Sequence, residues 1–188
     1  MNKEIKSNTV AASKVTFTEL MLPSHSNFSG KIHGGFLLQL MDQIAFACGS
    51  KYSGSYCVTA SVDTVDFLNP VEIGELVTLK ASVNYVGNTS MVIGIRVVSE
   101  NIRTGKVKHC NSSYFTMVAK DEDGNPTKVP HLELKNFDEV RRFFDAVRRI
   151  NQKKKLKTLE EKFDYQSTEA MKLLENYNVK INKKRFIK

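Results

Sequence analysis

Apolar residues are densest between residues 34 and 51, and their length and spacing predict one long helix. This stretch contains a single carboxylate, Asp42. Its apolar members are Phe36, Leu37, Leu38, Leu40, Met41, Ile44, Ala45, Phe46, Ala47 and Cys48. A helix that is apolar nearly all round is expected at the centre of a core. Because a carboxylate does not stay ionised in a dry core without partners, Asp42 should face a cleft or an interface.

Segments rich in alternating apolar and polar residues lie on both sides of this helix. They predict a strand within residues 15–22 and four more within residues 56–67, 76–86, 91–97 and 106–118. The turn residues 87–90 join two of them as a hairpin. An antiparallel sheet must cover its apolar face, and the long helix is the only candidate large enough. The pattern therefore predicts an α+β fold, an antiparallel sheet wrapped around a long central helix.

The C-terminal part of the chain has a different character. Apolar residues recur at spacings of three and four, which predicts a helix whose first part docks on the domain. These residues are Phe137, Val140, Phe144, Val147 and Ile150. A lysine-rich run follows at 153–157, and residues 131–188 carry 16 Lys or Arg against 9 Asp or Glu. We expect an N-terminal segment over 1–13, a main domain over 14–130 and a basic helical extension over 131–188.

Composition excludes several classes of protein. With 188 residues, 41% of them hydrophobic, the chain can bury one sizeable core. It has no apolar run near 18 residues and no signal-peptide core, so we expect a cytoplasmic protein without a membrane span. Cys48, Cys57 and Cys110 suggest reduced packing residues rather than disulfides or a zinc site. No P-loop, GxGxxG or GxSxG is present, which argues against a kinase, a Rossmann enzyme and a serine hydrolase.

An ordered set of motifs adds a family resemblance over about residues 14–120. The set comprises Asn27 in a loop, His33-Gly34-Gly35, Leu40-Met41-Asp42, Val58-Thr59-Ala60-Ser61-Val62-Asp63 and Phe67-Leu68-Asn69-Pro70-Val71. It resembles the acyl-CoA thioesterases of the hotdog fold, within them the broad acyl-CoA hydrolase group. The resemblance implies hydrolysis of acyl-CoA to fatty acid and CoA. It also implies that Asn27 of one subunit meets Asp42 of another, in a dimer at least and in a trimer of dimers as the full assembly.

Thioester hydrolysis needs a group that polarises the carbonyl and one that delivers water or a nucleophile. Gly34 and Gly35 allow close approach, and the free N–H groups of a helix start can hold an oxyanion. We expect the Gly35 N–H to polarise the carbonyl, Asp42 to act as general base or as nucleophile through an anhydride, and the Asn27 amide to orient water or substrate. For His33 the sequence leaves three roles possible: general base, cap of the loop, or contact with the substrate.

Further residues are expected to bind substrate because of their places in the resemblance. They are Thr59 and Ser61 on the strand after the helix, Thr89 and Ser90 at the hairpin turn, and Lys106, Lys108 and Asn111 on the next strand. Ordinary strand, turn and surface roles explain them about as well. CoA enters only as part of substrate and product, so no cofactor is expected. The histidines share no metal-ligand spacing, so no metal is expected either.

Two other functions compete with hydrolysis. The first is a non-catalytic acyl-CoA binding or sensing protein, whose basic tail contacts nucleic acid or an anionic membrane surface. No helix-turn-helix pattern precedes the fold, and binding alone has no need of Asn27 with Asp42, so no nucleic-acid partner is expected. The second is a hotdog dehydratase, which Asn27 at the loop position disfavours. The run 153–157 belongs either to a helix that is solvated or clasps another subunit, or to a site for an acidic partner or for the 3′-phosphate of CoA from a neighbouring subunit.

Overall fold

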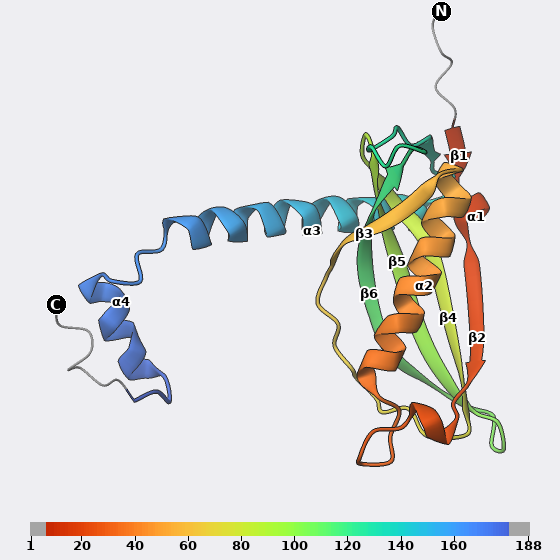
Figure 1. Ribbon diagram of the computed structural model, residues 1–188, viewed down its shortest axis with the longest axis horizontal. Helices are drawn as coiled ribbons and strands as arrows, with labels where there is room; N and C mark the ends of the chain where they lie inside the picture. The colour runs from red at the N-terminus through yellow and green to blue at the C-terminus, as the bar shows by residue number, and fades with distance from the viewer. Residues whose placement is uncertain (1–6, 181–188) are drawn as a thin grey trace, which may run out of the picture. The chain divides into compact units, whose positions relative to one another are not determined.

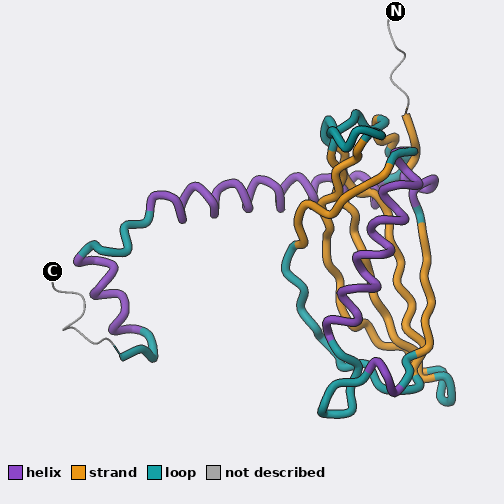
Figure 2. Tube along the Cα trace, in the orientation of Figure 1, coloured by secondary structure: helices purple, strands orange, loops and turns teal. Residues whose placement is uncertain are grey.

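The computed structural model describes residues 7–180, and its main feature is a five-stranded antiparallel sheet packed against helix α2 (Gly34–Ser53) (Figure 1). In spatial order the strands are β2 (Val15–Leu20), β4 (Glu75–Val86), β5 (Ser90–Asn101), β6 (Lys106–Lys120) and β3 (Tyr56–Val62). Figure 2 shows the strands running beside one another with the helix across one face. The expected α+β fold, the central helix and the five strands are confirmed.

Alternation of side chains along the strands builds the core between sheet and helix. On β4 the buried residues Val77, Leu79, Ala81 and Val83 share one face, and the residues between them point to the other face. β5 repeats this alternation next to β4. Helix α2 ends at Gly54, whose φ of +71° lies in the left-handed region that glycine readily adopts. The apolar face of the sheet is thereby covered by α2.

The helix is not enclosed on all sides, contrary to the expectation from its composition. Leu37, Met41 and Ile44 are buried against the sheet, but Leu38 is 36% exposed and Phe46 is 37% exposed. Asp42 lies on the same exposed side. Five strands cover only part of the circumference of a helix, so the opposite side of α2 stays open in the single chain. Asp42 therefore faces outward, as a carboxylate should.

Two short strands lie outside the main sheet. β1 (Ser7–Thr9) and β7 (His131–Glu133) pair in parallel, and α1 (Val10–Ser13) follows β1 directly. The Tyr52 hydroxyl donates to the His131 carbonyl at 2.9 Å, and burial raises the pKa of Tyr52 to about 12, so it remains a donor. Residues 7–9 and 131–133, which the sequence placed in flanking segments, thus pair with each other, and both form hydrogen bonds with Tyr52 near the end of α2.

The chain forms two compact units, Met1–Val147 and Arg148–Lys188. α3 (Phe137–Lys162) begins in the first unit, and the second contains α4 (Thr168–Leu173). Two 3-10 turns, Pro23–His25 and Leu174–Asn176, complete the list of helical elements. Among residues 7–180 no helix combines the length and hydrophobicity that a membrane crossing requires.

The first part of α3 packs with only some of the predicted residues, since Val140 and Val147 are half-buried but the two predicted phenylalanines are not. Phe137 and Phe144 are 93% and 64% exposed, whereas Ala146 is fully buried and the Phe143 ring lies 5.3 Å from that of Tyr85. Phe143 and Phe144 are adjacent, so a spacing of three and four does not determine which of them faces inward. The prediction that this part docks was right, but the docking face is rotated.

Candidate active site

Asp42 and Thr59 form the closest polar contact on the open side of α2. The Thr59 hydroxyl, on β3, donates to Asp42 Oδ1 at 2.6 Å. Asp42 Oδ2 has no hydrogen-bond partner within residues 7–180. A hydroxyl bond to a carboxylate is short and directional, so Thr59 fixes the orientation of Asp42 and leaves its second oxygen available.

These two residues line an open hollow with a volume of ≈ 630 Å³. The remaining lining is Phe17, Gln43, Phe46, Ala47, Tyr56, Cys57, Val58 and Met117. Asp42 is the only charged residue in that lining, and the other side chains are mostly apolar. The Phe46 and Tyr56 rings contact edge to face at 5.3 Å, and Met117 Sδ lies 3.3 Å from the Thr59 hydroxyl. One oriented carboxylate in an apolar hollow suits a substrate with an apolar chain and one reactive polar group.

Asn27 is held by its own loop. Its Oδ1 accepts hydrogen bonds from the Ser29 N–H at 2.9 Å, the Ser29 hydroxyl at 2.7 Å and the Lys31 N–H at 3.2 Å. Backbone N–H groups only donate, so the atom that faces them is the amide oxygen and the NH₂ group points away. This NH₂ group has no acceptor among the described residues. The loop therefore presents Asn27 as a rigid, available hydrogen-bond donor.

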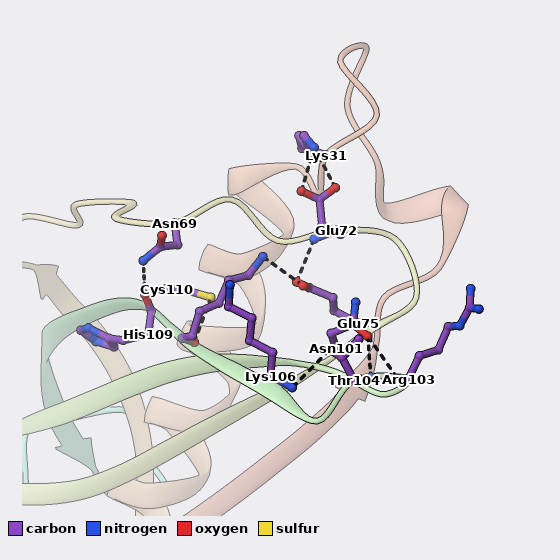
Figure 3. Close-up of polar contacts among 11 residues, drawn as sticks. Lys31, Asn69, Glu72, Glu75, Asn101, Arg103, Thr104, Lys106, His109 and Cys110 are labelled. Carbon is purple, nitrogen blue, oxygen red and sulfur yellow. Dashed lines mark hydrogen bonds and ion pairs between the residues drawn. The ribbon is translucent and has the colours of Figure 1, made fainter.

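A chain of polar contacts ties this loop to β6 (Figure 3). Lys31 Nζ contacts both carboxylate oxygens of Glu72 at 2.7 and 2.8 Å. The Glu72 N–H donates to Glu75 Oε2 at 3.0 Å, and Glu75 Oε1 lies 3.0 Å from Lys108 Nζ. Burial raises the pKa of the Glu75 carboxyl, but the hydrogen bond from Glu72 and the contact with Lys108 outweigh it and hold the pKa below its usual value. The Asn27 loop thus rests on an ionised, 5% exposed glutamate.

The start of α2 offers one open backbone donor. His33 caps the helix, and its Nδ1 accepts from the Gly35 N–H at 2.9 Å. The expected carbonyl-polarising donor is therefore occupied by His33, in the capping role that the sequence left open. The Gly34 N–H has no acceptor among residues 7–180. A side chain at position 34 would meet the Phe67 ring at 3.2 Å, so glycine there allows the ring to pack closely against the helix start.

The other expected substrate-binding residues fall into two groups in the single chain. Strand register places Thr59, Met117 and Met91 in one row, and Ser90 lies in the row beside it, so the Thr89–Ser90 turn is close to the Asp42 hollow. Ser61 follows Thr59 across a bulge in β3. Lys108 lies nine residues before Met117 on β6, roughly 30 Å away along the strand.

That second group differs from the expected exposed, phosphate-binding surface. Lys108 is paired with Glu75, so its charge already has a partner in the chain. Asn111 is fully buried, and neither polar atom of its side chain has a hydrogen-bond partner among residues 7–180. Lys106 is exposed and forms no ion pair with the described residues. Of the three, Lys106 alone is placed to meet an anion directly from this chain.

The sequence did not single out Phe46, Tyr56 or Met117 as site residues. Apolar residues at helix and strand positions look like core residues until the open side of α2 is known.

As to metals, residues 7–180 contain no cluster of three His, Cys, Asp or Glu side chains able to hold an ion.

Comparison with known proteins identifies the family of this chain. The family model of the Thioesterase superfamily matches residues 29–106. Protein VdlD of Helicobacter pylori is 45% identical over 142 residues, which cover 76% of this chain and 81% of VdlD. YkhA of Bacillus subtilis, an uncharacterized acyl-CoA thioester hydrolase, is 34% identical over 145 residues, covering 77% of this chain and 84% of YkhA.

Solved structures point to the same family. An apo-hexameric acyl-CoA thioesterase aligns with a TM-score of 0.80 and 38% identity over 82% of this chain and 99% of that one. The acyl-CoA hydrolase of Staphylococcus aureus, in complex with butyryl-CoA, CoA and CoA disulfide, aligns with a TM-score of 0.75 and 28% identity over 82% of this chain and 94% of that one. With the matching family model, the similar relatives and the sheet wrapped on α2, this chain belongs to the hotdog-fold acyl-CoA thioesterases.

Proposed function

We propose that this protein hydrolyses acyl-CoA to a fatty acid and CoA at a site shared by two copies of the chain, Asp42 from one and Asn27 from the other. The observation that carries the proposal is the 2.6 Å bond from Thr59 to Asp42 in an apolar hollow. The hollow accommodates the acyl chain, and the free oxygen of Asp42 acts at the thioester.

Two chemical roles for Asp42 are consistent with this arrangement. As general base, Oδ2 takes a proton from water while the water oxygen attacks the thioester carbonyl, and CoA leaves as the thiolate. As nucleophile, Oδ2 attacks the carbonyl itself, the C–S bond breaks and CoA leaves as the thiolate, and water then cleaves the mixed anhydride to release the fatty acid and the Asp42 carboxylate. In both, the Asn27 NH₂ group donates to the water or to the substrate. The open Gly34 N–H, or the Gly35 N–H after His33 releases it, stabilises the oxyanion.

The solved variants of the Staphylococcus aureus enzyme support the choice of residues. In three structures an asparagine, an aspartate or a threonine of that protein is replaced by alanine. Counted along that chain, the replaced residues are separated by 15 and 17 positions, the separations of Asn27, Asp42 and Thr59 here. The three types of residue match in the same order.

Several features favour a site between subunits. No hydrogen bond joins Asn27 to Asp42 within residues 7–180, although each has an available polar group. The open side of α2 exposes Leu38 and Phe46, and β2 and β3 are unpaired edges of the main sheet. A homo-oligomer can pair the edge strands β2 and β3 with strands of another copy, and it can bury the exposed side chains on the open side of α2. The similar hexameric thioesterase makes a trimer of dimers the natural assembly to propose.

Mixing of two inactive variants tests the proposal. Asp42→Asn and Asn27→Ala, each inactive alone in thiol release from acyl-CoAs of several chain lengths, are co-expressed with different tags and purified through both. If each site takes one residue from each chain, a mixed dimer regains one of its two sites, so doubly tagged dimers recover about half of the wild-type sites and randomly mixed hexamers about a quarter. Mixed assemblies without recovered activity would overturn the shared site. A wild-type protein that binds acyl-CoA without releasing thiol would overturn hydrolysis.

A further inference from the structure

The second compact unit of the chain contributes nothing to the hollow at Asp42. Within the described residues it contains the last turns of α3, the helix α4 and the 3-10 turn Leu174–Asn176. The residues that line the hollow all lie between Phe17 and Met117. The surface chemistry of the second unit is therefore separate from the proposed hydrolysis.

The part of α3 in this unit carries a dense positive charge. Residues 148–157 contain six Lys or Arg and no Asp or Glu. Ten helical residues span about 15 Å, so the six cations lie within a short length of helix. Lys154 and Lys155 form no ion pair with any side chain that the structure describes. Such a concentration of one charge attracts a surface of the opposite sign.

Large apolar side chains lie exposed beside these cations. Leu156 and Leu159 are three residues apart on α3, so they share one side of the helix. Phe163 follows four residues later, directly after the last residue of α3. The three side chains are 47% to 65% exposed. A row of apolar side chains exposed to water is typical of an interaction surface.

The turn between α3 and α4 displays two aromatic rings at the end of this row. The Ser167 hydroxyl donates to the Asp164 carbonyl at 2.8 Å and accepts from the Ala170 N–H at 3.1 Å, which caps α4. The Phe163 and Tyr165 rings contact edge to face at 5.0 Å, and Tyr165 is mostly exposed. Hydrogen bonds thus define a turn whose aromatic side chains face the solvent.

We propose that residues 148–165 bind the surface of a lipid bilayer that contains anionic headgroups. A basic helix with leucine and aromatic side chains is suited to lie in the plane of a membrane interface. Lys153 and Lys155 lie three and four residues before Leu156 and Leu159, so each cation is beside an apolar side chain. Lysine stems extend along apolar surface while their ammonium groups reach the lipid phosphates.

The leucines favour a bilayer over nucleic acid as the partner. Cations bind either one, and aromatic rings also stack on bases. Leucine side chains gain little from a phosphate backbone or from stacking, whereas transfer into the acyl region of a bilayer buries them. Binding to a bilayer does not depend on the proposed hydrolysis.

Fluorescence tests whether the turn enters the bilayer. The chain has no tryptophan, so Phe163→Trp introduces a single indole into the full-length protein. We expect its emission to shift to shorter wavelength with vesicles of equal parts phosphatidylglycerol and phosphatidylcholine, and not with phosphatidylcholine alone. Ile102→Trp, at an exposed turn of the first unit, is the control whose emission should stay unchanged.

Sedimentation with the same vesicles separates the apolar and the charged contributions. Leu156→Gln combined with Leu159→Gln should weaken binding about tenfold or more, since two apolar side chains no longer enter the bilayer. Lys154→Gln combined with Lys155→Gln should weaken it by a similar factor, since each cation near an anionic surface contributes about fivefold. The matched controls are Ile102→Gln with Val107→Gln and Arg103→Gln with Lys128→Gln, all at exposed positions of the first unit.

Wild-type affinity is expected in both control variants, and unchanged thermal unfolding of all variants verifies that the fold is kept. No binding of the wild type to phosphatidylglycerol vesicles, or equal losses in extension and control variants, would overturn the proposal. So would wild-type affinity in the leucine variant, or an equal emission shift at positions 163 and 102. Duplex DNA that binds more tightly than the vesicles, with no loss in the leucine variant, would identify a nucleic-acid surface instead.

Discussion

The main sheet has a hollow on each face, and the two hollows differ most in charge. The hollow at Asp42 has one carboxylate among mainly apolar side chains. The basic hollow, on the face opposite α2, has no carboxylate, and its charged lining residues are Lys14, Lys80, Arg96, Arg141 and Arg142. Neighbouring residues of a strand contribute to different hollows: Phe17 lines the first and Thr16 the second. Because successive side chains alternate between faces, one set of strands supports two separate chemistries.

The contrast also concerns what each hollow lacks. Asp42 has its hydrogen bond from Thr59 and an oxygen without a partner among the described residues, and the proposed mechanism adds a substrate and the donor on the Asn27 loop. Lys80 and Arg96 lie opposite each other without counter-charges from the described chain. Substitutions that affect one hollow and leave the other unchanged therefore test whether the two are independent.

The largest expected effect is loss of catalysis in Asp42→Asn. The amide has nearly the same shape but is neither a base nor a nucleophile, so kcat should fall about 10³-fold, within the range for removal of a general base. Thiol release from acyl-CoA measures it. Glu122→Gln, an exposed acid in a turn, is the charge-matched control.

Binding to phosphatidylglycerol vesicles should be unchanged in Asp42→Asn, because the residues proposed for it lie outside this hollow. A variant that loses both activity and vesicle binding would show that the substitution disturbs assembly or folding rather than catalysis alone.

The next largest effect is on stability, in Glu75→Gln. Lys108 then keeps a half-buried charge without its partner, and the free energy of unfolding at pH 7 should fall by about 2 kcal/mol. Because the pKa of Glu75 is lowered in the folded chain, the unfolded chain binds this proton more tightly. The stabilisation is complete above the unfolded carboxyl pKa, near 4.3, and disappears as pH falls through the lower folded value.

Urea unfolding at several pH values measures that dependence. The difference in free energy of unfolding between wild type and Glu75→Gln should become smaller below about pH 4. Glu72→Gln is the comparison, because its ion pair with Lys31 is 40–45% exposed and should contribute less than about 1 kcal/mol. A pH-independent gap would mean that the Glu75 carboxylate is not the stabilising species.

A smaller effect is expected from Thr59→Val. The valine side chain has nearly the same size but does not donate, so Asp42 loses the contact that orients it. We expect kcat to fall about tenfold with KM nearly unchanged, the cost of one hydrogen bond to a charged group. Steady-state kinetics measure it, with Thr18→Val on β2 as the matched strand control. Unchanged kcat would mean that Thr59 does not orient the reactive carboxylate.

Much of the Asp42 side could be predicted from the sequence. One carboxylate in an apolar helix had to face outward, and alternation gave the strands of the main sheet to within a few residues. β1 and β7 were not predicted, because three-residue strands have too few positions to show alternation. The inward face of α3 was only partly right: Val140 and Val147 are half-buried, but Phe143 rather than Phe144 faces inward, because adjacent phenylalanines fit either rotation of the helix.

The basic hollow depends on information that a single sequence does not display. Lys80 and Arg96 are separated by a hairpin, and they oppose each other only because a bulge between Val83 and Tyr85 shifts the strand register by one residue. The same holds for Lys108, whose partner Glu75 lies on another strand. Strand register over long sequence separations decides which charged residues meet. Lys108 was therefore expected to bind phosphate, although its charge is already paired with Glu75.

The smallest expected effect follows from that register. If Lys80 and Arg96 repel each other, Arg96→Gln should stabilise the protein by about 0.5 kcal/mol at low salt. Salt screens exposed charges, so the gain should shrink toward zero near 1 M sodium chloride. Thermal unfolding in a phosphate-free buffer measures it, with Arg103→Gln as control. A destabilised Arg96→Gln at low salt would mean that Arg96 already has a favourable partner, and the argument for repulsion between the two opposed cations would fail.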